Sequence, residues 1–207
     1  MKIKMRPPAG HTRGARRRTA VLSEGIYQLK VVLAGSEPPI WRRIQVPGDF
    51  NLASLHHVLQ RVMGWEDCHL HEFMINQTSY GSAASSDGLF APKMLDESNV
   101  RLKEVLPPAG KSFQYVYDFG DDWIHEIKVE KISPPEKGAS YPRCLEGENA
   151  CPNEDSGGIY GHYGLLKILQ DPGHPDYEDI KEWMGRFDPS FFSLEAVNRR
   201  LRRQTGG

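Results

Sequence analysis

The sequence predicts an α+β fold, in which a mainly antiparallel sheet packs with helices in a single domain. Strand-like segments with a period of two come mostly early in the chain, and helix-like segments come mostly late. The length of 207 residues fits one domain of ordinary size, and a hydrophobic content of 39% is sufficient for a packed core.

The early strands follow from alternating apolar residues. Residues 26–33 alternate in this way, and residues 40–46 form a second strand after the turn Glu37-Pro38-Pro39. Residues 70–80 are expected as a third strand, followed by a loop rich in Ser, Gly, Ala and Asp over residues 81–93.

The clearest helix is expected over residues 52–63. Its apolar residues recur at helical spacing, with Asn51 as the N-cap and Gly64 as the residue that ends the helix.

A β-hairpin is predicted from two aromatic and β-branched runs, residues 113–119 and 123–132, separated by Gly120-Asp121. A two-residue loop there would make Asp118 and His125 diagonal neighbours on one face of the sheet. Such a pair could serve catalysis or a metal, or could be a satisfied polar pair beside a buried tryptophan. A three-residue loop would turn one strand over and separate the two side chains.

The rest of the chain is expected to be loops and short helices. Residues 100–106 fit either a strand or a helix, and residues 134–161 are predicted as a long loop. Helices are predicted over residues 163–170, over residues 177–184 with Asp176 as cap, and after the cap Ser193, with Leu194, Val197 and Leu201 facing inward.

The near-zero net charge of −1 hides an uneven distribution. Residues 1–23 contain seven basic residues and no acidic one, and the C-terminal end adds four arginines. Setting these eleven aside leaves 15 basic against 27 acidic residues, a balance of −12. We therefore expect a flexible basic arm over residues 1–23 and a single acidic α+β domain over residues 24–207.

The basic arm has two interpretations. Arg16, Arg17 and Arg18 could neutralise phosphates and give weak, salt-dependent binding of nucleic acid. Alternatively, the arm is a solubilising tail, because the acidic domain would repel a duplex.

Three cysteines are too few for a disulfide framework, and no apolar run approaches the ~20 residues that cross a bilayer. We expect a cytoplasmic protein that does not bind a membrane.

Zinc is the natural candidate if a metal binds, because the available donors are thiols and imidazoles. The candidate ligands are Cys144, Cys151, His69, His71, His125 and His162. In the alternative interpretation, both cysteines are small buried apolar residues, and the histidines hydrogen-bond to backbone.

Several phrases resemble one known family. They are residues 39–43 (PIWRR), 63–65 (MGW), 69–73 (HLHEF), 117–125 (YDFGDDWIH), 141–144 (YPRC) and 150–158 (ACPNEDSGG). Together they are similar to the plasmid pRiA4b ORF-3-like family, over roughly residues 26–192. The resemblance implies a compact α+β domain, found in bacteria and archaea and also carried by an insertion element. Family members commonly have cysteine where Ser156 stands and proline where Asn153 stands.

The leading functional hypothesis is a binding or interaction domain for an unknown protein or small ligand, associated with plasmids or mobile elements. No recognised catalytic signature is present, and no glycine-rich fingerprint for a nucleotide follows a strand. The alternative is a metal-dependent hydrolytic enzyme that uses Asp118 and His125, or the other histidines with the cysteine loop.

Overall fold

The computed structural model describes residues 25–82 and 94–203. The predicted arm over residues 1–23, including Arg16, Arg17 and Arg18, lies outside this part of the chain, as does most of the predicted 81–93 loop. Nucleic-acid binding through the arm therefore stays a prediction.

The predicted α+β fold is confirmed. One sheet runs in the order β5-β4-β3-β6-β7-β1-β2-β8, and all neighbours are antiparallel except the parallel pair β4 and β5. The strands are β1 (Ile26–Leu33), β2 (Trp41–Pro47), β3 (His71–Ile75), β4 (Thr78–Gly81), β5 (Leu95–Asp96), β6 (Ser112–Tyr117), β7 (Trp123–Ser133) and β8 (Arg143–Glu148).

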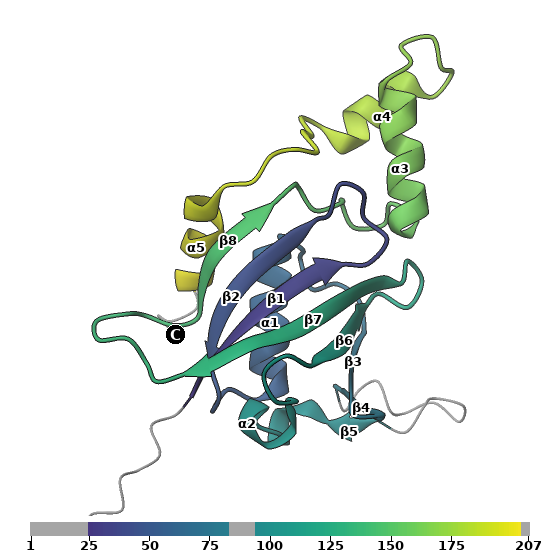
Figure 1. The fold of residues 1–207 in the computed structure, drawn as a ribbon. Coiled ribbons are helices and arrows are strands. Elements are labelled where there is room, and N and C mark those ends of the chain that lie inside the picture. Colours follow the sequence, from purple (N-terminus) through teal and green to yellow (C-terminus); the bar gives the residue numbers. More distant parts are fainter. Residues whose placement is uncertain (1–24, 83–93, 204–207) are drawn as a thin grey trace, which may run out of the picture.

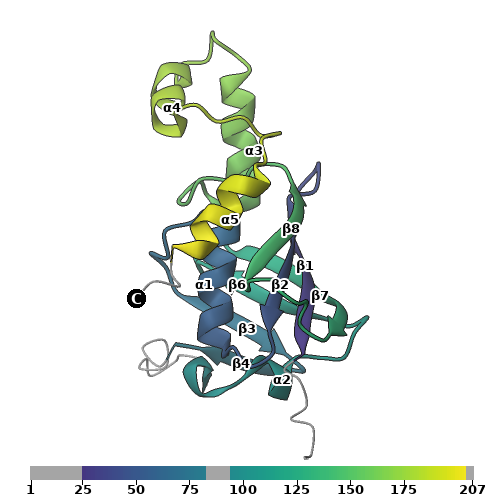
Figure 2. The same cartoon turned by 90° about the vertical axis from the view of Figure 1, so that its left-hand side faces the viewer.

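The helices in the described residues are α1 (Leu52–Met63), α2 (Leu102–Val105), α3 (Gly158–Leu169), α4 (Tyr177–Met184) and α5 (Leu194–Arg202), and Glu97–Asn99 form a 3₁₀ turn. Figures 1 and 2 show α1 and α5 on the same side of the sheet, and α3 with α4 projecting beyond one end of it. Helix α1 begins and ends where predicted, because Asn51 accepts a hydrogen bond from the Ser54 N–H and Gly64 takes a left-handed conformation.

The core lies between α1 and the sheet. The apolar stripe of α1, which includes Leu55, Leu59 and Val62, is fully buried against alternate side chains of β1, β6 and β7. The opposite side of the sheet carries exposed charged residues such as Glu126 and Lys128. An antiparallel sheet with one face covered produces this alternation.

The predicted two-residue hairpin loop is wrong. Tyr117 pairs with Trp123 and Tyr115 pairs with His125, so the β6–β7 connection runs over residues 118–122. The turn begins early because Asp118 takes a left-handed conformation (φ 58°), while its carboxylate Oδ1 accepts a hydrogen bond from the Gly120 N–H. The shift of register turns β6 over relative to the prediction.

Three other segments differ from expectation. Residues 70–80 form the hairpin β3–β4 around Asn76 and Gln77 instead of one strand. Residues 100–106, for which a strand and a helix were both open, contain the short helix α2. The predicted 134–161 loop contains the edge strand β8 and the first turn of α3, which begins at Gly158. In α5, Ser193 caps the helix as predicted, but Leu194 is 39% exposed instead of buried.

Candidate functional site

The structure places the predicted site residues in several separate regions. Asp118 lies in the β6–β7 turn, whereas His125 lies in β7 with its Nδ1 3.3 Å from the Tyr115 carbonyl oxygen. The pairing that predicted a contact between Asp118 and His125 is therefore not formed. Burial lowers the pKa of His125 to about 4, so this imidazole is neutral at physiological pH.

The two loop cysteines have different neighbours. The Cys144 thiol lies 3.4 Å from the Glu146 carbonyl oxygen, and Cys151 Sγ lies 3.5 Å from Met63 Sδ. Burial raises the pKa of both thiols. Within residues 25–82 and 94–203, no group of three candidate metal ligands includes a cysteine.

His71 belongs to a buried polar network. Its Nε2 lies 2.8 Å from Glu97 Oε2, and its ring stacks on the His56 ring with centroids 3.5 Å apart. His56 in turn contacts Tyr115 Oη through Nδ1 and Asp67 Oδ1 through Nε2. Burial, followed by repulsion from His71, lowers the pKa of His56 to about 4. These partners leave His71 in a structural role inside the core.

His69 faces the other way, toward two carboxylates. Its Nε2 lies 3.1 Å from Asp155 Oδ1 and 3.7 Å from Asp118 Oδ2. The three residues come from the α1–β3 connection, the β6–β7 turn and the loop before α3. His69, Asp118 and Asp155 are called the His–Asp cluster below.

The His–Asp cluster lies beside a hollow of about 330 Å³ that includes Cys68 and Glu154 in its lining. Tyr117 Oη accepts hydrogen bonds from the Cys68 and His69 N–H groups and donates one to Glu154. The pKa of the Cys68 thiol is raised, by desolvation and then by four carboxylates that include Glu154 and Asp155. Glu66, Glu154 and Asp155 in its lining give the hollow a negative charge.

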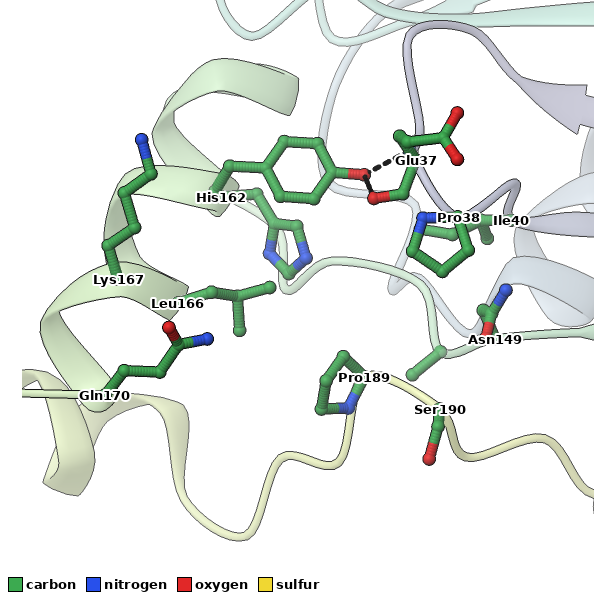
Figure 3. Close-up of a pocket in the computed structure, with 12 residues that line it drawn as sticks. Glu37, Pro38, Ile40, Asn149, His162, Leu166, Lys167, Gln170, Pro189 and Ser190 are labelled. Carbon is green, nitrogen blue, oxygen red and sulfur yellow. Dashed lines mark hydrogen bonds between the residues drawn. The ribbon is translucent and has the colours of Figure 1, made fainter.

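A second cavity, of about 640 Å³, lies between α3, the β1–β2 connection and residues 189–190. Figure 3 shows His162 and Leu166 of α3 facing Pro38 and Pro189 across it. Tyr163 also lines this cavity, and its hydroxyl forms hydrogen bonds with the backbone N–H and carbonyl of Glu37. This region is called the α3 cavity below.

His162 is the most buried polar residue of the α3 cavity, with 2% of its surface exposed. Its Nδ1 has no hydrogen-bond partner among the described residues. Burial lowers the pKa of this imidazole, so the ring is neutral at physiological pH.

None of the helices in the described part of the chain has the length and apolar character needed to cross a bilayer. The fold is that of a single α+β domain with a mainly antiparallel sheet. Helix α3 lines one hollow, and the loop before α3 lines the other.

The chain belongs to the plasmid pRiA4b ORF-3-like protein family, whose model matches residues 25–196. It is 38% identical over 164 residues to the uncharacterized protein y4hQ of Sinorhizobium fredii, which covers 79% of this chain and 82% of that protein. The crystal structure of the protein of unknown function MM3350 from Methanosarcina mazei Go1 has a TM-score of 0.75 and 38% identity, covering 83% of this chain and 97% of that one. The predicted family is thus confirmed.

Sequence reasoning missed Asp155 and Tyr117 as site residues. Asp155 lies in an acidic stretch that reads as a solvated loop, and Tyr117 reads as a strand residue of the hairpin. The sequence signals were the acidic pair Glu154-Asp155, which could bind a hard cation, and the presence of Tyr117 and Asp155 in two of the family phrases.

Proposed function

We propose that this chain is a binding domain whose small organic ligand occupies the α3 cavity. The observation that carries the proposal is a cavity of about 640 Å³ lined by a buried imidazole with an uncommitted nitrogen. Ligand pockets typically have volumes of about 300–1,000 Å³, mainly apolar walls and a few polar groups that orient the ligand.

The walls define the chemistry of the ligand. Pro38, Ile40, Leu166 and Pro189 offer apolar surface, which favours an aromatic or aliphatic body. The neutral His162 favours a hydrogen-bonding group such as a hydroxyl, an amide or a carboxylic acid. A buried nitrogen left without a partner costs roughly 1–3 kcal/mol, so a ligand that satisfies it binds more tightly.

Helix α3 itself supports a binding role. Its sequence is apolar on several sides, yet only Gly158 and His162 are buried, and Tyr160 is 90% exposed. A helix of this composition normally packs against something on most of its surface.

The test uses the full chain and two kinds of probe: the dye 1-anilinonaphthalene-8-sulfonate, followed by fluorescence, and a panel of aromatic acids and amides, followed by ligand-observed NMR. Leu166→Arg places a charge in the cavity wall and is expected to weaken binding tenfold or more. Ile132→Arg makes the same kind of change at an exposed position in β7 and is expected to bind as the wild type does. Equal binding by Leu166→Arg and the wild type, or no binding by any probe, would contradict the proposal.

A further inference from the structure

We infer that the His–Asp cluster is a binding site for a divalent transition-metal cation of the zinc type. The inference is independent of the α3 cavity, because the two regions have no lining residue in common. It rests on the arrangement of three donor atoms, on an orphaned imidazole nitrogen and on the charge around it.

The donor atoms are already close together. His69 Nε2 and one carboxylate oxygen each from Asp118 and Asp155 all lie within 4.8 Å of one another. Two ligands held 2.0–2.2 Å from a zinc ion at the tetrahedral angle lie about 3.4 Å apart. The separations of 3.1 Å and 3.7 Å from Nε2 to the two carboxylates bracket that value.

His69 Nε2 lacks the partner that a buried nitrogen normally has. It is shielded from solvent and makes no hydrogen bond to any described residue, even though Asp155 Oδ1 lies 3.1 Å away. The contact has the distance of an ion pair without the geometry of a hydrogen bond. A cation between the imidazole and the carboxylates would satisfy this nitrogen.

The charge at the cluster favours a cation. In the described part of the chain, the ion-pair partner of both Asp118 and Asp155 is His69, and neither carboxylate has a lysine or arginine within 4.0 Å. The Asp118 side chain is only 12% exposed, so water screens its charge weakly. A bound divalent ion would neutralise both carboxylates.

Neighbouring residues hold the donors in place. Tyr117 Oη binds the backbone N–H of His69, and the Gly120 N–H binds Asp118 Oδ1, which leaves Oδ2 toward the imidazole. The Gly157 N–H bonds to Asp121 Oδ2, which ties the loop of Asp155 to the β6–β7 turn. Supporting hydrogen bonds of this kind orient metal ligands.

The donor set selects the class of metal. An imidazole with two carboxylates suits zinc and its neighbours in the first transition row better than magnesium or calcium, which prefer oxygen ligands. Three protein ligands would leave a coordination position for water, and two of them, His69 and Asp155, also line a hollow of about 330 Å³. Catalytic zinc sites share this open arrangement, whereas structural zinc sites are closed.

The test measures metal content and Co²⁺ absorption of the full chain. After incubation with Zn²⁺ and dialysis, the wild type is expected to retain one equivalent. Co²⁺ is expected to give visible bands of a nitrogen and oxygen site without the intense near-ultraviolet band of a thiolate ligand. No retained metal would overturn the inference.

The variants Asp118→Asn and Asp155→Asn are expected to weaken metal binding tenfold or more. Both positions have positive φ, of 58° and 57°, which asparagine tolerates. Asp155 is 73% exposed at its side chain, so its variant should fold even if the Asp118 variant does not.

Two controls identify a competing site. His56, His57 and Asp67 form the other cluster of candidate ligands in the described residues, and Cys68 is an exposed thiol. Asp67→Asn and Cys68→Ser are expected to bind metal as the wild type does. Loss of binding in either one, with binding retained in Asp155→Asn, would place the metal elsewhere and overturn the inference.

Discussion

His125 shows at the scale of a single residue how burial controls protonation. The ring is fully buried in β7, makes an edge contact with Trp65 and has an Nε2 without a hydrogen-bond partner among the described residues. Desolvation outweighs its backbone hydrogen bonds and lowers its pKa to about 4. The residue therefore acts as a neutral, polar component of the aromatic core.

This burial predicts a pH dependence of stability. The unfolded chain binds a proton at His125 below its ordinary pKa of about 6.5, whereas the folded chain does so only below about 4. The contribution of His125 to the free energy of unfolding is therefore complete above about pH 6.5 and declines as the pH falls toward about 4. Between about pH 7.5 and 5, wild type is expected to lose about 2 kcal/mol more unfolding free energy than His125→Leu. Urea unfolding at both pH values measures this, and parallel losses in the two proteins would show that His125 is not responsible.

At the scale of the element, turns decide which strands pair. The β3–β4 hairpin turns at Asn76 and Gln77, which both have positive φ, of 51° and 65°. Two successive left-handed residues produce a tight turn that suits the twist of the strands, and Asn-Gly is the favoured pair. Glutamine has no such preference, so the sequence reads as one continuous strand.

Gln77→Gly is therefore expected to stabilise the protein by about 0.5–1 kcal/mol, because glycine removes the steric penalty of the left-handed conformation. Gln77 is exposed, so no buried contact is lost. Urea unfolding measures the change. Met74→Gly, in the adjoining strand, is the control and is expected to destabilise the protein. A destabilised Gln77→Gly protein would show that the side chain contributes more than the turn conformation.

Local signals explain which elements could be predicted from the sequence. The predicted bounds of α1 and α4 agree with the observed bounds, because the helical periodicity and the end signals lie within each segment. Strand β8 was missed because it is a short edge strand with the charged sequence RCLEGE. The hairpin register was missed because the turn at Asp118 depends on a hydrogen bond from its N–H to the Leu70 carbonyl oxygen, distant in sequence.

The same distinction applies to the candidate sites. His69 and Asp118 could be selected by residue type, whereas Asp155 becomes a candidate only once the fold brings the loop before α3 against the β6–β7 turn. The α3 cavity was not predictable, since it is lined by residues from four separate segments of the chain.

At the scale of the whole molecule, one junction connects both proposed sites to the sheet. The loop with Asp155 leads directly into α3, and the start of α3 lies against the β6–β7 turn. Gly158 has a φ of 68°, and a Cβ at this position would lie 2.4 Å from the Asp121 carbonyl oxygen. Both the backbone conformation and the close contact require glycine.

Gly158→Ala is therefore expected to destabilise the protein by about 2–4 kcal/mol, because the strained conformation and the overlap with backbone must both be relieved. Relief would move the start of α3 and the Asp155 loop away from the β6–β7 turn. Zinc binding and probe binding in the α3 cavity are thus expected to weaken together.

Gly164→Ala is the matched control in the same helix, where a Cβ meets nothing within 4 Å. The Gly164→Ala variant is expected to be about 1 kcal/mol more stable than the wild type and to bind both zinc and the cavity probes. Urea unfolding and the two binding assays measure these effects, and a Gly158→Ala protein with wild-type stability and binding would show that this junction does not position the two sites.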